Sequence, residues 1–289
     1  MKAAARLRQL MKEQDLVLAP GGYDGITARL IEQAGFSCLY MTGAGTSAAL
    51  GFPDLGLLTM TEMVDNAGTM ARSVSIPLIA DADTGYGNEL NVTRTVREFE
   101  ARNVAAIHIE DQVFTKRCGH LDDKEVITSN EYVAKIRAAV AARRDPDFMI
   151  IARTDARAVH GLDEAIDRAN AALEAGADMA FVEAPQSLSE MAEVPRRVRG
   201  PCLLNMVPGG RTPIISAAQA QEMGYRLMIM PGALLNRMLL AGDLALQRIK
   251  ELGGPEKPAD NEDVRDFFRR FGSDEWSELR QRFQSPPKE

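Results

Sequence analysis

The feature that most constrains the fold is a repeated alternation of short apolar runs with amphipathic segments. Eight apolar runs recur about every thirty residues. A strand that is apolar throughout is typical of a parallel sheet covered on both faces. The runs are Leu16–Ala19, Cys38–Thr42, Pro77–Ala80, Ala105–Ile109, Phe148–Ala152, Met179–Val182, Cys202–Asn205 and Leu227–Met230. Helical patterns lie between them, such as Leu90–Ala101, Asn130–Ala142 and Asp163–Ala175.

Eight strand–helix units predict an α/β fold of the (β/α)8 type, a TIM-type barrel, which takes about 250 residues. An open, doubly wound parallel sheet has the same periodicity and stays open as the alternative. No G-x-G-x-x-G follows the first run, which weakens a dinucleotide-binding interpretation. Gly176 comes directly after the helical pattern Asp163–Ala175, and we expect it to end that helix.

The two ends of the chain fall outside the eight units. Residues 1–13 form a predicted leading helix. Near the other end, the predicted helices Asn261–Phe271 and Ser273–Phe283 carry apolar side chains that a barrel does not need, among them the single Trp276. We therefore divide the chain into a barrel with its N-terminal helix, residues 1–255, and a C-terminal helical extension, residues 256–289. The extension packs on its own barrel or on a neighbouring subunit, and the pattern does not choose between them.

Composition excludes several classes of partner. The formal net charge is −7, which argues against binding to nucleic acid. No apolar run reaches the roughly 20 residues that span a membrane. The N-terminal segment is charged and has no apolar core, so we expect no signal peptide. Three widely spaced cysteines make no disulfide framework, and only three histidines are present, so we expect a cytoplasmic location and no zinc site of several histidines.

Acidic residues follow the predicted strands. Asp81 and Asp83 follow the third run, and Glu110 follows the fourth. Active sites of (β/α)8 barrels lie at the carboxyl ends of the strands, so these acids would converge there. They would repel one another unless a cation lay among them, and ligands that are all oxygen favour Mg²⁺, or Mn²⁺, over zinc. Each acid alone could instead cap a helix or pair with an arginine.

Further polar groups end other strands. A buried guanidinium at Arg153 would need an anionic partner and matches a carboxylate in shape. Small residues at Thr42, Gly43 and Ala44 would let a ligand approach the backbone. Glu183 and Asn205 end two later strands, and Gly210 belongs to a Pro-Gly-Gly segment that either donates backbone N–H groups or simply turns the chain.

The segment Lys116-Arg117-Cys118-Gly119-His120 is the most specific in the chain. Its cysteine is flanked by cationic side chains, a setting that lowers the pKa of a thiol. The glycine suits a loop that closes over a substrate. Cys38 and Cys202 lie in apolar runs instead, and we expect them to pack in the core.

From about Leu16 to the C-terminal helices, the sequence resembles the isocitrate lyase/phosphoenolpyruvate mutase superfamily, most of all its 2-methylisocitrate lyase and 2,3-dimethylmalate lyase branch. The motifs that carry the resemblance are Gly51-Phe52-Pro53-Asp54, Asp81 to Gly87, Ile109-Glu110-Asp111-Gln112, Lys116 to His120, Ala152-Arg153-Thr154-Asp155 and Phe181 to Pro185. The loop around Cys118 is typical of the lyases. The resemblance implies a (β/α)8 barrel whose eighth helix is swapped between subunits, in a homotetramer that is a dimer of dimers.

The resemblance also implies roles. It makes the chain a Mg²⁺-dependent carbon–carbon lyase that cleaves a 2-hydroxy di- or tricarboxylate into an α-keto acid and a carboxylic acid. Asp81, Asp83 and Glu110 would hold the metal ion. Cys118 would be the catalytic thiol, with Lys116 and His120 in the same loop, and Tyr40 the base. The groups that would bind the small anionic substrate are Thr42, Gly43, Ala44, Arg153, Glu183, Asn205 and Gly210.

One departure from the family pattern and three alternatives stay open. Methylisocitrate lyases have Ser-Gly-Gly where this chain has Thr42-Gly43-Ala44, so the acid that is cleaved is undecided. A carboxyvinyl-carboxyphosphonate phosphonomutase-like isomerase is one alternative, against which the Cys118 loop argues. An oxaloacetate hydrolase is another, although such relatives carry serine where this chain has Pro231. A barrel that binds carboxylates without catalysis is the last.

Overall fold

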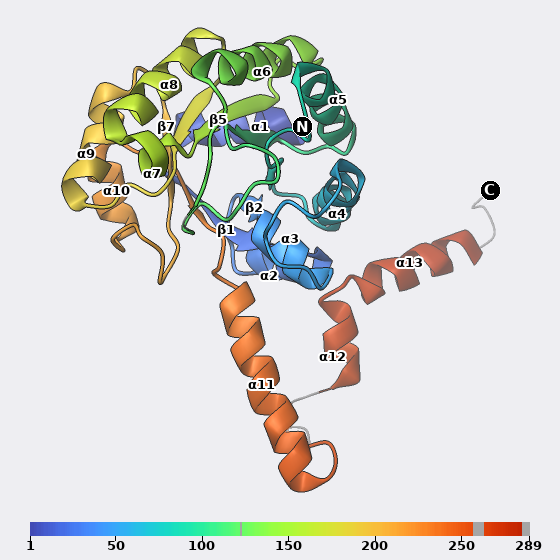
Figure 1. Cartoon of the computed structure of the whole chain (residues 1–289). Helices are drawn as coiled ribbons and strands as arrows, with labels where there is room; N and C mark the ends of the chain where they lie inside the picture. The colour runs from blue at the N-terminus through green and yellow to red at the C-terminus, as the bar shows by residue number, and fades with distance from the viewer. Residues whose placement is uncertain (122, 257–262, 285–289) are drawn as a thin grey trace, which may run out of the picture. The chain divides into compact units, whose positions relative to one another are not determined.

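The computed structural model describes residues 1–121, 123–256 and 263–284. Its centre is a closed ring of eight parallel strands in chain order, in which β8 pairs with β1 (Figure 1). The predicted barrel is therefore confirmed, and closure of the ring excludes the open sheet. The strands are β1 (Val17–Gly22), β2 (Leu39–Met41), β3 (Leu78–Asp81), β4 (Ala106–Glu110), β5 (Met149–Thr154), β6 (Met179–Val182), β7 (Cys202–Asn205) and β8 (Leu227–Met230).

The helices of the barrel lie around the ring (Figure 1). They are α2 (Gly25–Gln33), α3 (Gly43–Ala49), α4 (Met60–Ser73), α5 (Glu89–Ala101), α6 (Ser129–Ala142), α7 (Ala156–His160), α8 (Leu162–Glu174), α9 (Leu188–Arg197) and α10 (Ala217–Met223). Helix α8 ends where predicted, because Gly176 follows it with a φ of 102°. Four helices begin with a capping box, so their first N–H groups are satisfied by Asp24, Thr59, Thr128 and Ser216.

Helix α1 (Ala3–Glu13) covers the end of the barrel at which the strands begin. Its Leu7 and Leu10 are buried in one cluster with inward-facing strand residues such as Ile79. Arg8 donates to Asp178, directly before β6, at 2.8 Å. With this end filled by apolar side chains, the opposite end is left for polar groups.

The predicted bounds of β1 differ most from the structure. The prediction ended this strand at Ala19, before Pro20-Gly21-Gly22. Both glycines continue the strand instead and pair with Tyr40 and Met41 of β2. A Cβ on Gly21 would lie 2.3 Å from the carbonyl oxygen of Pro231, so glycine is needed where β1 passes β8.

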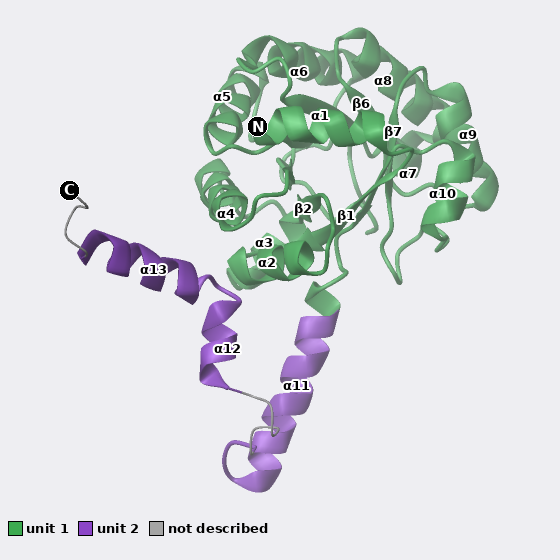
Figure 2. Cartoon of the chain, turned by 180° about the vertical axis from the view of Figure 1, so that it is seen from behind, with its two compact units in different colours: residues 1–236 green, residues 237–289 purple. Residues whose placement is uncertain are grey.

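The chain divides into two compact units, Met1–Asn236 and Arg237–Glu289 (Figure 2). Helix α11 (Leu235–Leu252) begins in the first unit, while α12 (Val264–Arg269) and α13 (Ser273–Gln284) belong to the second. The start of the predicted helix Asn261–Phe271, at 261–262, lies outside the described residues. The division at residue 255 stays a prediction. Across the described ranges, no helix is both long and apolar enough to span a membrane.

Candidate active site

A cavity of about 180 Å³ lies at the carboxyl ends of the strands, where the active site was predicted. It receives side chains from β2, β3, β5 and β7, from Glu183 directly after β6, and from the loop between β4 and α6. Ten of the fourteen predicted site residues line it, namely Tyr40, Thr42, Ala44, Asp81, Lys116, Cys118, His120, Arg153, Glu183 and Asn205. The other four, Gly43, Asp83, Glu110 and Gly210, lie behind this lining.

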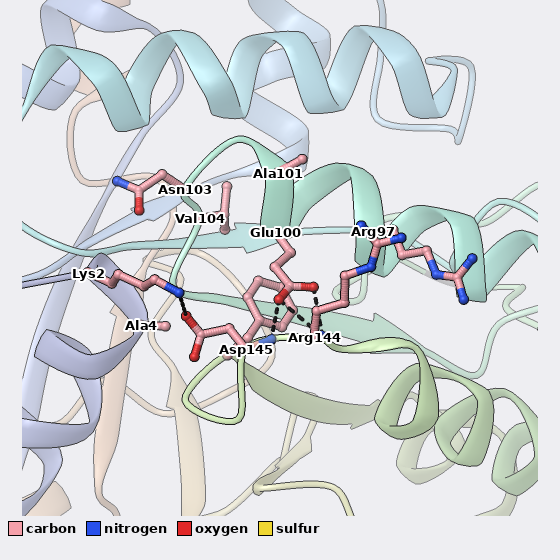
Figure 3. A pocket seen from close by; sticks show the side chains of 10 residues that line it. Lys2, Ala4, Arg97, Glu100, Ala101, Asn103, Val104, Arg144 and Asp145 are labelled. Carbon is pink, nitrogen blue, oxygen red and sulfur yellow. Dashed lines mark hydrogen bonds and ion pairs between the residues drawn. The ribbon is translucent and has the colours of Figure 1, made fainter.

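A larger cavity, of about 370 Å³, lies at the end of the barrel where β4 and β5 begin (Figure 3). Its carboxylates already have partners. Glu100 accepts the backbone N–H groups of Arg144 and Asp145, and Lys2 donates to Asp145 at 3.0 Å. These contacts attach α1 to the loops that precede the strands. The polar groups of this cavity therefore hold parts of the fold together.

Asp81, the last residue of β3, is held in place by backbone donors. Its two oxygens accept the N–H groups of Gly43 at 3.2 Å and Asp83 at 2.9 Å. Burial alone would raise the pKa of Asp81, but His108, which is protonated in acid, and the cations Lys116 and Arg153 bring it down to about 2. A Cβ on Gly43 would lie 2.4 Å from the Asp81 carboxylate, so glycine is needed there. The backbone of Gly43 thus holds the Asp81 carboxylate in place.

Lys116 lies between two carboxylates. Its ammonium is 2.8 Å from Oδ1 of Asp83 and also contacts Asp54. Burial would lower the pKa of Lys116, but the surrounding carboxylates raise it well above its ordinary value. Burial raises the pKa of Asp83 to about 6, against the charge of Lys116. Lys116 therefore ties Asp54, before α4, to the loop after β3.

Glu110 fits a metal ligand. Among the described residues, neither of its buried oxygens has a hydrogen-bond partner, and its one ion pair is with Arg153 Nε at 3.2 Å. Burial raises the pKa of Glu110 well above its ordinary value, although Arg153 opposes this. A buried acceptor without a donor is satisfied by a cation or by water bound to one. The donor set of Asp81, Asp83 and Glu110 thus fits Mg²⁺.

The carboxylates do not form a complete metal cage. Within residues 1–121, 123–256 and 263–284, no three His, Cys, Asp or Glu side chains are gathered closely enough to hold an ion by themselves. Magnesium usually keeps several waters and binds through one or two carboxylates together with oxygens of its substrate. The arrangement therefore suits an ion that is completed by water and substrate.

Arg153 is fixed from three sides. Its Nε donates to Asp155 at 2.9 Å, its Nη2 lies 3.4 Å from Glu183, and its guanidinium stacks 5.1 Å from the ring centroid of Phe181. Glu183 in turn accepts from the amide of Asn205 at 3.1 Å. These contacts hold one cation, one carboxylate and one amide rigidly at the wall of the cavity, which is how a carboxylate-binding site is organised in advance.

Tyr40 is paired with a histidine. Its hydroxyl lies 2.8 Å from Nε2 of His108 and 3.5 Å from the Asp81 carboxylate. Burial lowers the pKa of His108 to about 4, so the imidazole is neutral at pH 7. Burial, with Asp81 nearby, raises the pKa of Tyr40 well above its ordinary value. A base role for Tyr40 thus requires a cation beside its hydroxyl.

The loop with Cys118 lies directly on the site. A Cβ on Gly119 would be 2.5 Å from Nη2 of Arg153 and 2.6 Å from Cγ of Glu183, so a side chain there would force the loop away. Nδ1 of His120 accepts the backbone N–H of Arg211 at 3.1 Å. Gly210 lies against the same imidazole and does not line the cavity.

The predicted lowering of the Cys118 pKa is wrong. Burial raises it, and the backbone N–H of His120 only partly compensates. The sequence showed the cations around the thiol but not its burial. A raised pKa keeps Cys118 protonated, which is the form that a proton donor needs. Cys38 and Cys202 are buried in apolar clusters, as predicted.

Four further residues of the site were not assigned from the sequence: Asp54, His108, Lys124 and Asp155. Asp54 and Asp155 belong to motifs of the family resemblance, which could have identified them. His108 and Lys124 are different. His108 lies within an apolar run, and Lys124 lies in a charged loop segment, so each had the appearance of an ordinary position.

Comparison with known proteins agrees with this geometry. The sequence profile of the family described as phosphoenolpyruvate phosphomutase matches residues 7–250. The chain is 50% identical over 234 residues to 2,3-dimethylmalate lyase of Eubacterium barkeri, covering 81% of each chain. It is 47% identical over 247 residues to 2-methylisocitrate lyase of Aeropyrum pernix, covering 86% of this chain and 80% of that one.

A solved structure extends the likeness to the whole fold. The structure of oxaloacetate acetylhydrolase in complex with the inhibitor 3,3-difluorooxalacetate superimposes with a TM-score of 0.94 and 40% sequence identity, covering 99% of each chain.

Proposed function

Since the chain belongs to the phosphoenolpyruvate mutase/isocitrate lyase superfamily, we propose that it is a carbon–carbon lyase acting on a 2-hydroxy di- or tricarboxylate. The acid is of the 2,3-dimethylmalate or 2-methylisocitrate type, and the products are an α-keto acid and a carboxylic acid. One observation carries the proposal. Cys118, a protonated thiol, lies in the same cavity as the Arg153–Glu183 pair and the Asp81 carboxylate.

The proposed cleavage begins with loss of the substrate hydroxyl proton. The carbon–carbon bond beside that hydroxyl then breaks, and its electron pair passes to the other fragment as an enediolate. Cys118 gives its proton to the carbon of this enediolate and completes the carboxylic acid. Tyr40 is the proposed base, with its hydroxyl held by His108 at 2.8 Å. The burial that keeps Cys118 protonated therefore serves the last step.

The metal ion is part of the proposal. Asp81, Asp83 and Glu110 would hold Mg²⁺ or Mn²⁺. When bound, the ion would polarise the hydroxyl and carboxylate oxygens of the substrate half that becomes the keto acid. Lys116 keeps Asp83 in place through the contact of 2.8 Å, and the Gly43 N–H fixes Asp81. The chain thus supplies oriented carboxylates.

The substrate carboxylates are bound by groups that already hold each other. Arg153 and Asn205 present donors at one wall of the cavity, and His120 lies 3.3 Å from Glu183. Thr42 caps α3 by accepting the N–H of Gly45. Ala44, in the first turn of that helix, lines the cavity. Donors that are fixed before the reaction stabilise the developing anion without reorganisation.

The direct test is a substrate panel. Purified protein with Mg²⁺ is incubated with 2,3-dimethylmalate, 2-methylisocitrate, citramalate, isocitrate and oxaloacetate, and keto acid is followed over time. We expect release of keto acid from at least one of the first two acids. Release of none from any member would contradict the proposal, and the further absence of oxalate, with binding intact, would favour a carboxylate-binding barrel.

Oxaloacetate hydrolysis is a second candidate, because the structural likeness to oxaloacetate acetylhydrolase covers 99% of both chains. Pro231, the residue that the family resemblance sets against this candidate, lies in the cavity lining. Oxalate formation in the oxaloacetate arm of the panel would favour this candidate. A mutase-like isomerase would instead turn over a phosphonate without releasing keto acid.

We also propose a cytoplasmic homotetramer with the helix after β8 swapped between subunits. Its support is the second unit, in which large apolar side chains such as Leu244, Phe267 and Trp276 are exposed. Neither α12 nor α13 has a buried residue, and nor does α11. Apolar surface of this extent marks a protein interface. Sedimentation velocity measures the assembly.

A further inference from the structure

We propose that Lys124 is a positioning residue, which fixes Cys118 over the site by binding the backbone beside it. The inference rests on the proposed role of Cys118. Lys124 lies between β4 and α6, and only 2% of its side chain is exposed. Its ammonium donates to the carbonyl of Gly119 and lies 3.1 Å from Oδ1 of Asp155. It therefore joins the thiol segment to the end of β5.

The carbonyl that Lys124 binds belongs to the residue directly after the thiol. The preceding carbonyl, of Cys118 itself, accepts the N–H of Leu121 at 2.9 Å. On the other side, the Gly119 backbone lies so close to Arg153 that a Cβ would overlap its guanidinium. Lys124 thus draws the peptide against the substrate-binding cation, and the position of Cys118 follows from it.

The anchor of Lys124 is itself immobile. Asp155 is fully buried, and its backbone N–H donates to Asp111 at 2.8 Å. Asp111 is held in turn by Thr154 at 2.6 Å and by Arg168 at 3.1 Å. A buried carboxylate with this support does not move with the loop. Lys124 therefore attaches the segment from Lys116 to His120 to a fixed point of the barrel, the Asp155 carboxylate.

Asp155 also binds Arg153, the proposed substrate-binding cation. Nε and Nη2 of Arg153 lie 2.9 and 3.3 Å from its two oxygens, on the same carboxylate that receives Lys124. One carboxylate therefore sets both the substrate-binding guanidinium and the thiol segment. This arrangement fixes the distance and orientation between Cys118, the proposed proton donor, and Arg153, the proposed anion-binding group. Proton transfer to one particular carbon requires such fixed geometry.

The test compares Lys124→Met with Asp123→Asn. Methionine keeps the apolar stem of the lysine and removes the ammonium. Asp123 is the matched control, because it is the adjacent residue and its side chain is 86% exposed. Its φ of 57° is tolerated by asparagine as well as by aspartate. Circular dichroism and thermal melting establish that each variant is folded.

The first readout is alkylation of Cys118 by iodoacetamide without substrate, followed by mass spectrometry. Loss of one charge-assisted hydrogen bond should speed alkylation in Lys124→Met by about tenfold. Asp123→Asn should stay within about twofold of the wild type, the scale of an exposed charge. The buried Cys38 and Cys202 serve as internal references. This readout needs no turnover, so it decides the proposal even if the proposed reaction is wrong.

The second readout is the kinetics on whichever acid the panel identifies. We expect kcat of Lys124→Met to fall by roughly 10- to 100-fold, the effect of a displacement of about 1 Å, while KM changes by less than about threefold. A role in folding alone would lower the melting temperature and leave kcat per folded molecule unchanged.

Wild-type alkylation rate and wild-type kcat in Lys124→Met would overturn the proposal and leave the lyase function intact. Should the methionine variant not fold, Lys124→Gln keeps one donor for the Gly119 carbonyl and removes the charge. Its alkylation should still exceed the wild-type rate by about threefold. An unchanged rate in that variant would overturn the proposal equally.

Discussion

The pKa of each carboxylate at the cavity depends on the charged side chains next to it. Asp81 has a pKa near 2, because neighbouring cations outweigh its burial, while burial raises the pKa of Asp83 two residues away to about 6. Arg153 and Lys116 are each shared among several acids. A change at one residue therefore shifts the protonation of the next.

Cys118→Ser tests the proton donor. Serine preserves the size of the side chain but is a far weaker acid than a thiol of pKa about 8.5. We expect kcat to drop by roughly 10²- to 10⁴-fold with little change in KM, since the proposed substrate-binding groups Arg153 and Asn205 are unchanged. Keto-acid release is the measurement. Cys202→Ala is the control, which should lower the melting temperature through lost core volume and keep kcat. Near-normal kcat in the serine variant would contradict the role.

The pH dependence of kcat has a predicted direction. A donor must be protonated, and burial raises the pKa of Cys118, so activity should persist past the ordinary thiol value of about 8.5 and be lost only above it. A kcat–pH profile measures this alkaline limb. The same limb should be missing from the residual activity of Cys118→Ser. An alkaline limb centred below pH 8 would be inconsistent with the buried thiol.

Removal of the metal ion should abolish turnover. Chelator in excess takes away the proposed ion, which would polarise the substrate oxygens, and added Mg²⁺ or Mn²⁺ should restore activity. Asp81→Asn should raise the Mg²⁺ concentration needed for half-maximal activity by at least about tenfold. Asp65→Asn, an exposed carboxylate paired with Arg102, is the control. Full activity in excess chelator would refute the metal assignment.

Which residues lie at the cavity was predictable from local sequence signals, and the pairing of residues distant in sequence was not. Asp81 and Arg153 stand out because each follows an apolar run, and Cys118 because cationic side chains flank it. The contact of Tyr40 with His108 joins residues 68 apart, on the two strands that flank β3, and only the folded sheet brings them together. The Cys118 pKa was predicted in the wrong direction for a similar reason, since burial by other segments has no local signature.

At the scale of elements, the turn from β2 into α3 is the tightest part of the site. Its backbone passes the end of β3 so closely that the Gly43 N–H donates to Asp81 at 3.2 Å. The strands themselves were predictable to within one or two residues except at β1, because a continuous apolar run is a local signal. The extension of β1 through Gly21 was not, since its reason is the backbone of the segment after β8.

Gly43→Ala tests this turn. A Cβ would lie 2.4 Å from Asp81 Oδ2, so the carboxylate or the helix must move. We expect a loss of about 1–3 kcal/mol in the free energy of unfolding and a weaker response to Mg²⁺. Thermal melting and Mg²⁺ titration of activity measure both. Wild-type behaviour of Gly43→Ala would show that the turn can yield.

At the scale of the whole molecule, the extension bears on assembly. Deleting residues 261–289 removes exposed aromatic side chains, among them Phe267 and Trp276, that the proposed tetramer would bury. We expect the truncated protein to sediment as a smaller oligomer. The exposed apolar side chains of α11, such as Leu244, would remain and lose a contact in the proposed tetramer, which should lower solubility as well. Sedimentation of the truncated chain at the full-length oligomer size would contradict this assignment.

Pairing of β8 with β1 has a consequence for synthesis of the chain. The ring joins Val17 to Leu227, so it cannot close before the last strand has left the ribosome. At 5–20 residues per second, that wait is roughly 10 to 50 s. During it the growing sheet presents two open edges, at β1 and at its newest strand, each able to pair with another chain. A nascent chain stopped after β7 is thus a candidate for chaperone capture, although the finished barrel has no edge at all.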